Sequence, residues 1–140
     1  MITKKITYTD YDGNVRTEKF YFNLNEAELT EMQLEKAGGL GAWLEKIAEK
    51  QDNVEIMKMF KKLILRSYGE KSDDGRRLVK SEEISTAFTQ TEAYNQLLIE
   101  LMQGGDVTLL EFIRGILPEK YRGTITLNNV TPMAEVTKIE

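Results

Sequence analysis

Residues 53–94 decide the fold that this sequence predicts, and they read NVEIMKMFKKLILRSYGEKSDDGRRLVKSEEISTAFTQTEAY. The apolar residues within 53–65 recur at helical spacing, and they cover more of the circumference than a narrow stripe would. Asp52 or Asn53 supplies the N-cap, and Gly69 is expected to stop the helix at its C-terminus. A helix with so wide an apolar surface is usually covered by neighbours, so we expect this helix to be the central one.

A polar loop and two helix starts complete this stretch. Residues 70–80 carry turn-forming residues at 73–75 and predict a hairpin-like loop. Ser81 is the expected N-cap of the next helix, because two glutamates follow it in the first turn. Thr89 and Glu92 match a capping box, so the chain is expected to kink or to start a further helix there.

The N-terminal part of the chain predicts a β-hairpin. Residues 2–9 and 15–22 alternate apolar and polar side chains, and an Asp-Gly turn lies at 12–13 between them. A lone hairpin is marginally stable in water, so this one is expected to pack on helices or to pair with another strand. The only later strand pattern that we identify covers residues 124–130.

The remaining helices are predicted from caps and apolar faces. Asn25 and Glu28 form a capping box, so the first helix is expected to run from Asn25 to about Lys36, with Ala27 on its inward side. An amphipathic pattern at 40–51 predicts the second helix. Two broad apolar faces near the end of the domain predict the last two helices, which lie at about 93–102 and 106–117.

The predicted fold is mostly α with a small β part, in which the N-terminal β-hairpin packs on a bundle of about five to six helices. The domain covers residues 1–118, with the hairpin at 2–22 and the helices at 25–117. Residues 119–140 are polar and contain few large apolar side chains, so they predict a C-terminal tail that is either disordered or an added strand.

The composition excludes several classes of active site. The chain has 140 residues, of which 41% are hydrophobic and 30% charged, and this suits one globular domain. It contains no cysteine and no histidine, which excludes disulfides, thiolate metal ligands and the commonest general base. We therefore expect no enzyme, no catalytic residue, no metal and no cofactor.

Charge and hydropathy also limit the partners. The net charge of −4 disfavours nucleic acid as the main partner. No apolar run reaches the roughly 18 residues of a membrane span, so no membrane partner is expected. Met1 leads directly into a strand pattern rather than a signal peptide, and we expect the protein to act where it is made.

Two local patterns have a plain structural explanation. Residues 69–72, Gly-Glu-Lys-Ser, end like a phosphate-binding loop, but the upstream glycine is missing and the end of a helix explains them. Residues 10–14 approach a calcium-binding loop, but the glycine comes too early and the hairpin turn explains them. Neither pattern predicts a ligand site.

Two groups of charged residues permit further interpretations. A divalent metal or an acid–base pair would use the carboxylates of Asp73, Asp74, Glu82 and Glu83. Solvated carboxylates in a loop and at a helix start are the favoured explanation of that group. Nucleic acid would meet the basic side chains of Lys58, Lys61, Lys62, Arg66, Arg76, Arg77 and Lys80. Their acidic neighbours and the lack of interleaved aromatic residues favour a solvated face instead.

Several motifs together resemble one known family. They lie at residues 6–8, 20–29, 38–40, 68–72, 76–80, 88–94 and 112–116. In their order and spacing, from about Ile2 to Pro118, the chain resembles a tail assembly chaperone of long-tailed, siphovirus-type bacteriophages. The tail after Pro118 is outside this resemblance.

The resemblance implies a non-enzymatic role in the host bacterial cytoplasm. Such chaperones bind the tape-measure protein, keep this long helical chain soluble and promote polymerisation of the tail tube around it. Many are also made as a longer frameshifted product that contacts the major tail tube protein. The family supplies no catalytic residue.

The apolar helix faces predict where partners bind. They exceed what one small core requires, which fits a homo-oligomer or a surface for a client helix. Methionines on such faces suit varied helical partners, although filling the core is their default role. The predicted partner-binding residues are Tyr94, Leu98, Met102, Leu109, Phe112 and Ile113. The alternative functions are a structural virion protein (a tail-completion or connector subunit), a small metal-binding enzyme and a nucleic-acid-binding regulator.

Overall fold

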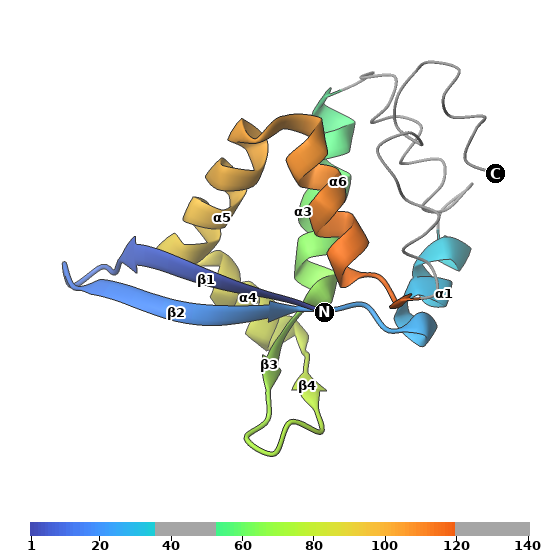
Figure 1. The fold of residues 1–140 in the computed structure, drawn as a ribbon, viewed down its shortest axis with the longest axis horizontal. Coiled ribbons are helices and arrows are strands. Elements are labelled where there is room, and N and C mark those ends of the chain that lie inside the picture. The colour runs from blue at the N-terminus through green and yellow to red at the C-terminus, as the bar shows by residue number, and fades with distance from the viewer. Residues whose placement is uncertain (36–52, 120–140) are drawn as a thin grey trace.

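The computed structural model describes residues 1–35 and 53–119, and these ranges form a four-stranded sheet and five helices (Figure 1). In chain order the elements are β1 (Ile2–Thr9), β2 (Val15–Phe22), α1 (Glu26–Glu35), α3 (Asn53–Ser67), β3 (Tyr68–Lys71), β4 (Leu78–Val79), α4 (Glu82–Thr89), α5 (Glu92–Gln103) and α6 (Gly105–Ile116). The fold is therefore mixed α and β, with a larger sheet than the sequence predicts. The helix predicted at 40–51, the strand pattern at 124–130 and the tail after Glu119 lie outside the described residues.

The predicted β-hairpin is confirmed. β1 and β2 pair antiparallel along their whole length, from Ile2 opposite Phe22 to Thr9 opposite Val15. In the connecting turn the Asp10 carboxylate accepts hydrogen bonds from the backbone amides of Asp12 and Asn14, at 2.9 and 2.8 Å. Gly13 has a φ of +86°, which a residue with a side chain adopts only with strain. The turn chemistry therefore sets the strand register.

Among the described residues the strand that extends this hairpin is β3, which the sequence did not predict. β2 pairs with β3, with Tyr21 opposite Gly69 and Phe22 opposite Tyr68, so the sheet order is β1-β2-β3-β4. Gly69 was expected to stop a helix, but it lies inside β3 directly after α3 ends at Ser67. A Cβ on Gly69 would lie 2.6 Å from Cγ of Leu78. Glycine is needed here because β3 and β4 approach closely, and four residues are too few to show an alternating pattern.

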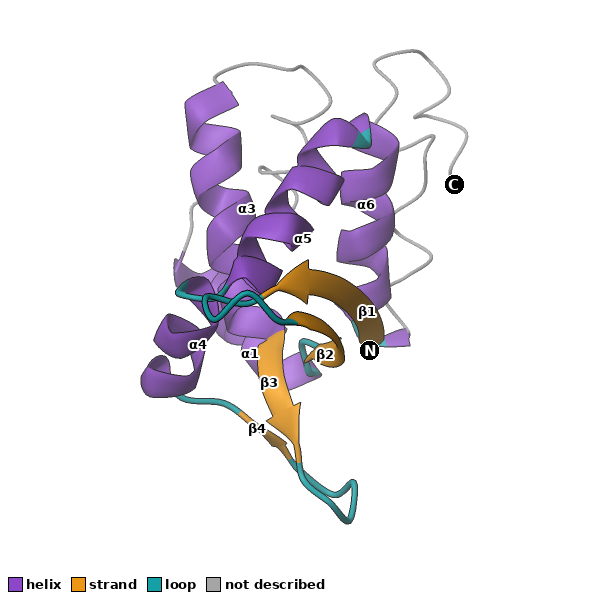
Figure 2. Ribbon diagram, turned by 90° about the vertical axis from the view of Figure 1, so that its left-hand side faces the viewer, coloured by secondary structure: helices purple, strands orange, loops and turns teal. Residues whose placement is uncertain are grey.

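The core forms where the helices cover the sheet around Phe22, which is fully buried. The ring centroid of Phe22 lies 5.4 Å from that of Phe112 on α6 and 5.6 Å from that of Tyr68 on β3. Phe88 of α4 lies 5.9 Å from Phe22 and stacks on Tyr68 at 4.1 Å. In Figure 2, α3, α5 and α6 lie on one side of the β1–β2 ribbon, and the β3–β4 hairpin projects away from them.

The helix that the sequence predicted to be central is α3, and only one of its faces is buried. Phe60, Leu63 and Ile64 are at most 1% exposed, whereas the side chains of the opposite face reach solvent. The solvent-facing residues of this helix include Val54, Lys58, Lys61 and Lys62. α3 is thus amphipathic rather than covered on all sides. Across residues 1–35 and 53–119, every helix is too short or too polar to cross a membrane.

The helix starts follow local hydrogen bonds, and two predictions near them need correction. At α1 the amide of Asn25 donates to Glu28 Oε1 at 2.9 Å, and the amide of Glu28 donates to Asn25 Oδ1 at 2.8 Å, which confirms the capping box. Ala27 is exposed, so its predicted inward position is wrong. Ser81 caps α4 as predicted, by accepting from the amide of Ile84. The cap of α5 is Thr91 instead of Thr89.

Thr89 fails as a cap because it still belongs to α4. Its hydroxyl donates to the carbonyl of Thr86 at 2.6 Å, within the last turn of that helix. Thr91 has an extended backbone, and its hydroxyl accepts from the amide of Tyr94 at 3.2 Å. Two threonines two residues apart offer the same side-chain chemistry, and the packing of Phe88 in the core decides where α4 ends.

Candidate partner-binding surface

Three of the six predicted partner-binding residues lie in the core. Leu109 is 6% exposed, Phe112 4% and Ile113 0%. The ring of Phe112 packs between those of Phe22 and Phe60, at centroid distances of 5.4 and 5.9 Å. These three side chains are therefore covered within the domain.

The other three residues follow one flank of α5. Tyr94, Leu98 and Met102 are spaced four residues apart, and this spacing places them on the same side of a helix. Tyr94 and Leu98 are half-buried against the core. Met102 is 36% exposed, and Ile99 beside it is 41% exposed although the sequence did not single it out. We call Leu98, Ile99 and Met102 the α5 strip.

Tyr94 anchors the N-terminal end of this flank. Its ring meets that of Phe88 edge-on at a centroid distance of 5.4 Å. Burial raises the pKa of the Tyr94 hydroxyl above its ordinary value. The ring thus joins α5 to α4.

Contacts to β1 and its turn hold α5 along the hairpin. The Tyr11 hydroxyl donates to Glu92 at 2.9 Å, and this hydrogen bond raises the pKa of Tyr11. At the other end of α5 the Lys4 ammonium donates to Glu100 at 2.5 Å. The first turn of α5 is therefore beside the hairpin turn, and its last turn is beside the start of β1.

Most of the exposed polar neighbours of the α5 strip on its own helix are uncharged. Its exposed polar neighbours on the helix include Asn95, Gln96 and Gln103. The nearest charge on the helix is that of Glu100, which pairs with Lys4. The centres of protein–protein interfaces are poor in charged groups, because charges are costly to desolvate. In a chain with 30% charged residues, this surface suits burial against another protein.

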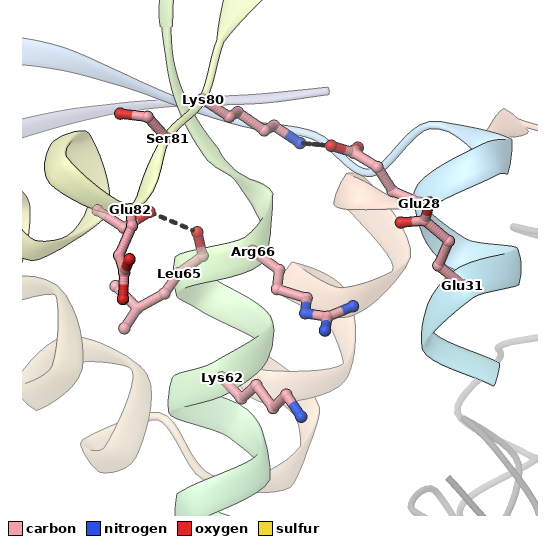
Figure 3. Close-up of a pocket in the computed structure, with 9 residues that line it drawn as sticks. Glu28, Glu31, Lys62, Leu65, Arg66, Lys80, Ser81 and Glu82 are labelled. Carbon is pink, nitrogen blue, oxygen red and sulfur yellow. Dashed lines mark hydrogen bonds and ion pairs between the residues drawn. The ribbon is translucent and has the colours of Figure 1, made fainter. Parts of the chain in front are cut away.

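A second concave surface lies between α1 and α3, and we call it the α1–α3 groove (Figure 3). It encloses about 590 Å³. Its lining residues are Glu28, Glu31, Lys62, Leu65, Arg66, Lys80, Ser81, Glu82 and Ser85. The α1 wall carries carboxylates and the α3 wall carries cations, and Figure 3 shows the Lys62 and Arg66 side chains on the side of α3 that faces α1.

The sequence did not predict this groove. Lys62, Arg66 and Lys80 belong to the basic run that would meet nucleic acid, but the structure distributes that run over three places. Lys58 and Lys61 lie on the exposed face of α3, and Arg76 and Arg77 lie in the β3–β4 turn. The carboxylates that face Lys62 and Arg66 come from α1, more than thirty residues earlier, and no sequence spacing signals that proximity.

The four carboxylates proposed as an alternative metal or acid–base group are divided between two elements. Asp73 and Asp74 lie in the β3–β4 turn, whereas Glu82 and Glu83 begin α4. Asp74 accepts hydrogen bonds from the Arg76 amide and the Ser72 hydroxyl, and these bonds lower its pKa. In the part of the chain that the structure describes, no three potential ligand residues gather closely enough to hold a metal ion.

The comparison with protein families gives one match. The phage tail assembly chaperone family matches residues 1–137. This match extends beyond Pro118, where the resemblance of the motifs was expected to end. No curated protein and no solved structure gives a significant match.

Proposed function

The chain belongs to the phage tail assembly chaperone family, and from this premise we propose that it binds the tape-measure protein and keeps that long helical chain soluble. It then promotes polymerisation of the tail tube around the bound chain, in the cytoplasm of the host bacterium of a long-tailed phage. The role is non-enzymatic. A longer frameshifted product would join this complex to the major tail tube protein.

The observation that carries the proposed contact is the exposed, uncharged α5 strip. Leu98, Ile99 and Met102 fall at positions that one side of a helix presents to a partner. An amphipathic client helix presents its own apolar residues at the same spacing, so two such surfaces bury each other. Methionine adapts its shape to different neighbours, and this suits a client whose sequence varies along its length. These features support client binding at α5.

Co-expression with the tape-measure protein tests this function. The wild-type chain should move the tape-measure protein from the insoluble to the soluble fraction. Replacing Ile99 and Met102 with lysine should weaken the complex about tenfold or more, because two charges would have to be desolvated at the contact. Pull-down and titration of a purified tape-measure segment measure the loss.

A matched variant controls for the added charges. Val15→Lys with Val54→Lys changes two apolar residues that are 71% and 66% exposed and belong to β2 and α3 rather than to α5. This variant should solubilise the client as well as the wild type. A wild-type chain that leaves the tape-measure protein insoluble would contradict the function, and equal losses in both variants would contradict the surface.

Mass spectrometry of purified virions separates this function from a structural virion protein. A chaperone leaves the particle once the tube has assembled, so the protein should be absent from mature virions. Its presence at a fixed stoichiometry would favour a tail-completion or connector subunit instead.

A further inference from the structure

The β1–β2 hairpin has one face that the helices leave uncovered. Successive side chains of a strand point to opposite faces, and those of Ile6 and Phe22 are buried on the helix side. The alternate side chains lie on the other face, and all of them except Tyr21 are exposed. We call this surface the open sheet face, and it consists of Thr3, Lys5, Thr7, Thr9, Val15, Thr17, Lys19 and Tyr21. In Figure 2 it is the side of the β1–β2 ribbon away from α3, α5 and α6.

A third cation reaches the open sheet face from β3. Tyr21 is opposite Gly69, so the alternation along β3 directs the Lys71 side chain to the same face. The Lys71 ammonium lies 5.1 Å from the centroid of the Tyr21 ring, a distance typical of a cation–π interaction. The ring therefore holds the positive charge of Lys71 on the face that carries Lys5 and Lys19.

Among the described residues, the open sheet face carries cations and no carboxylate. The carboxylates of the same strands point to the helix side: Glu18 accepts from the Tyr8 hydroxyl at 2.5 Å, and Glu70 shares the side of Tyr68 on β3. Lys5 and Lys19 form no ion pair with any residue of 1–35 or 53–119. In a chain with a net charge of −4, three cations are thus gathered on one face without acidic partners.

Two of these cations repel each other at short range. Lys5 is directly opposite Lys19. The Asp10 amide donates to the Asn14 carbonyl at 2.8 Å, so the alternation of an antiparallel ladder makes Lys5 and Lys19 a non-hydrogen-bonded pair. The Cβ atoms of such a pair are about 4.5–5.5 Å apart, and like charges there destabilise a hairpin. Bound carboxylates would remove this repulsion.

We propose that the open sheet face binds a helix of another protein that carries carboxylates one turn apart. The Cβ atoms of such residues are about 5–6 Å apart, which matches the separation of Lys5 and Lys19 across the strands. A third carboxylate meets Lys71, whose ammonium lies over Tyr21, about 7 Å along the strand from Lys19. The uncovered face of a sheet is also a surface on which a helix packs as a further layer.

The hydroxyls of this face support an acidic partner. Those of Thr7 and Thr17 meet at 2.9 Å in the row next to the two lysines. A hydroxyl donates to a carboxylate as well as to another hydroxyl, so each can turn towards a bound acid. The open sheet face therefore offers an acidic helix both charge and hydrogen-bond donors.

The charges beyond the two ends of this face favour a short acidic helix over nucleic acid. Asp10 and Asp12 lie in the β1–β2 turn, and Asp73 and Asp74 lie in the β3–β4 turn beyond Lys71. A nucleic acid carries phosphates at regular intervals and would meet these carboxylates, whereas a helix of a few turns can contact the lysines alone. The net charge of −4 acts in the same direction.

This inference goes beyond the proposed function. The open sheet face and the α5 strip share no residue, and the experiment below uses neither the tape-measure protein nor the α5 strip. Failure of one proposal therefore leaves the other unchanged.

Two synthetic peptides test the contact with the full chain. Both are alanine-rich helices of about 20 residues, a length that is helical in water. One carries its glutamates one turn apart on one side, and the other has the same composition with its glutamates spread around the helix. In fluorescence anisotropy the wild type should bind the first peptide about tenfold more tightly, because only that peptide meets the lysines together.

Charge reversal locates the contact. Lys5→Glu with Lys19→Glu should weaken binding of the first peptide about tenfold or more, because like charges then meet. The matched control is Lys58→Glu with Lys61→Glu, which reverses two exposed cations of α3 and changes the net charge equally. This control should bind like the wild type. Circular dichroism must show that both variants keep the fold.

A single substitution separates binding from folding. Lys19→Glu places opposite charges across β1 and β2, so it should raise the melting temperature while it weakens binding of the first peptide. Loss of binding in a protein that has become more stable is not explained by a damaged fold.

Four outcomes would overturn the proposal. They are a wild type that does not distinguish the two peptides, a folded Lys5 and Lys19 double variant that binds normally, equal losses in the α3 control, and displacement of the peptide by an equal concentration of a 20-base-pair DNA duplex, about the length of the peptide probe or longer. The last outcome would assign the open sheet face to nucleic acid instead.

Discussion

The ammonium of Lys80 lies 2.8 Å from one carboxylate oxygen of Glu28 and 2.9 Å from the other. The Glu28 oxygen at 2.8 Å also accepts the amide of Asn25, so one carboxylate closes the α1 capping box and holds the end of β4. Lys80 donates in addition to the Asn23 carbonyl at 2.5 Å. This relationship places α1 against the base of the β3–β4 hairpin and so forms one end of the α1–α3 groove.

Breaking this link should destabilise the domain measurably. Lys80→Met removes both the ion pair and the bond to Asn23, and we expect a loss of about 1–2 kcal/mol in urea unfolding, because the pair is only partly shielded from solvent. A double-mutant cycle with Glu28→Gln should give a coupling of about 0.5–1.5 kcal/mol. Additive effects of the two changes would show that the link contributes nothing.

Gly69 should not tolerate a side chain. In Gly69→Ala the new methyl group would lie 2.6 Å from Cγ of Leu78 and 3.0 Å from the carbonyl oxygen of Val79. Because a backbone atom is among these neighbours, the strands must separate, and we expect a loss of about 1–3 kcal/mol. Thermal unfolding measures the change.

The control for the Gly69→Ala variant is Gly75→Ala. An added Cβ at Gly75 meets nothing within 4 Å, so only the strain of its positive φ remains, at a cost of about 1 kcal/mol. Equal melting temperatures for the two variants would contradict the close approach of β3 and β4.

The aromatic core should depend on Phe22 more than on any exposed aromatic residue. Phe22→Ala removes a fully buried ring that contacts the rings of three other elements, and we expect a loss of about 3–5 kcal/mol. Tyr11→Ala changes a side chain that is 76% exposed and should cost within about 0.5 kcal/mol. Urea unfolding of both variants tests this contrast.

Alkaline pH should weaken the fold through Tyr68. Burial raises the pKa of Tyr68 from 10.0 to about 12, so the folded state disfavours the tyrosinate. The resulting stability is complete below pH 10 and is lost as the pH rises towards about 12, because the unfolded chain releases the proton first. Tyr68→Phe should therefore show a shallower fall of the urea midpoint between these pH values. Parallel curves for the wild type and the variant would refute this assignment.

Salt should test the uncharged character of the proposed client contact at the α5 strip. Between about 0.1 M and about 1 M salt the Debye length falls from about 10 Å to about 3 Å, so contacts between charged groups weaken. Binding of a tape-measure segment to the uncharged side chains of the α5 strip should therefore change little. A binding titration at both salt concentrations measures this, and a salt-sensitive client contact would contradict the role of α5.

Local signals explain the parts of the fold that the sequence predicted well. The 2–22 hairpin follows from strand alternation and an Asp-Gly turn, and the α1 start follows from Asn25 and Glu28. Each involves hydrogen bonds or neighbours within a few residues, or a strand pair joined by one short turn. The prediction failed where a signal was too short, as at β3, or was duplicated, as at Thr89 and Thr91.

Sequence periodicity also limited what could be predicted of the candidate surface. Periodicity identified the apolar sides of α5 and α6, but it does not say what covers them. Leu109, Phe112 and Ile113 are covered by the domain, whereas Met102 reaches solvent and Ile99 beside it was missed. A helix pattern records which residues share a side, and burial depends on elements that arrive from elsewhere in the chain.

The sequence by itself thus determined the helices and the first hairpin, the lack of cysteine and histidine chemistry, and the resemblance to the family. The tertiary structure decided which apolar sides remain exposed, which strand extends the sheet and how α1 and α3 oppose their charges across a groove. The physical reason is distance along the chain. Caps, turns and periodicity act over a few residues, whereas coverage and charge pairing depend on segments that folding alone brings together.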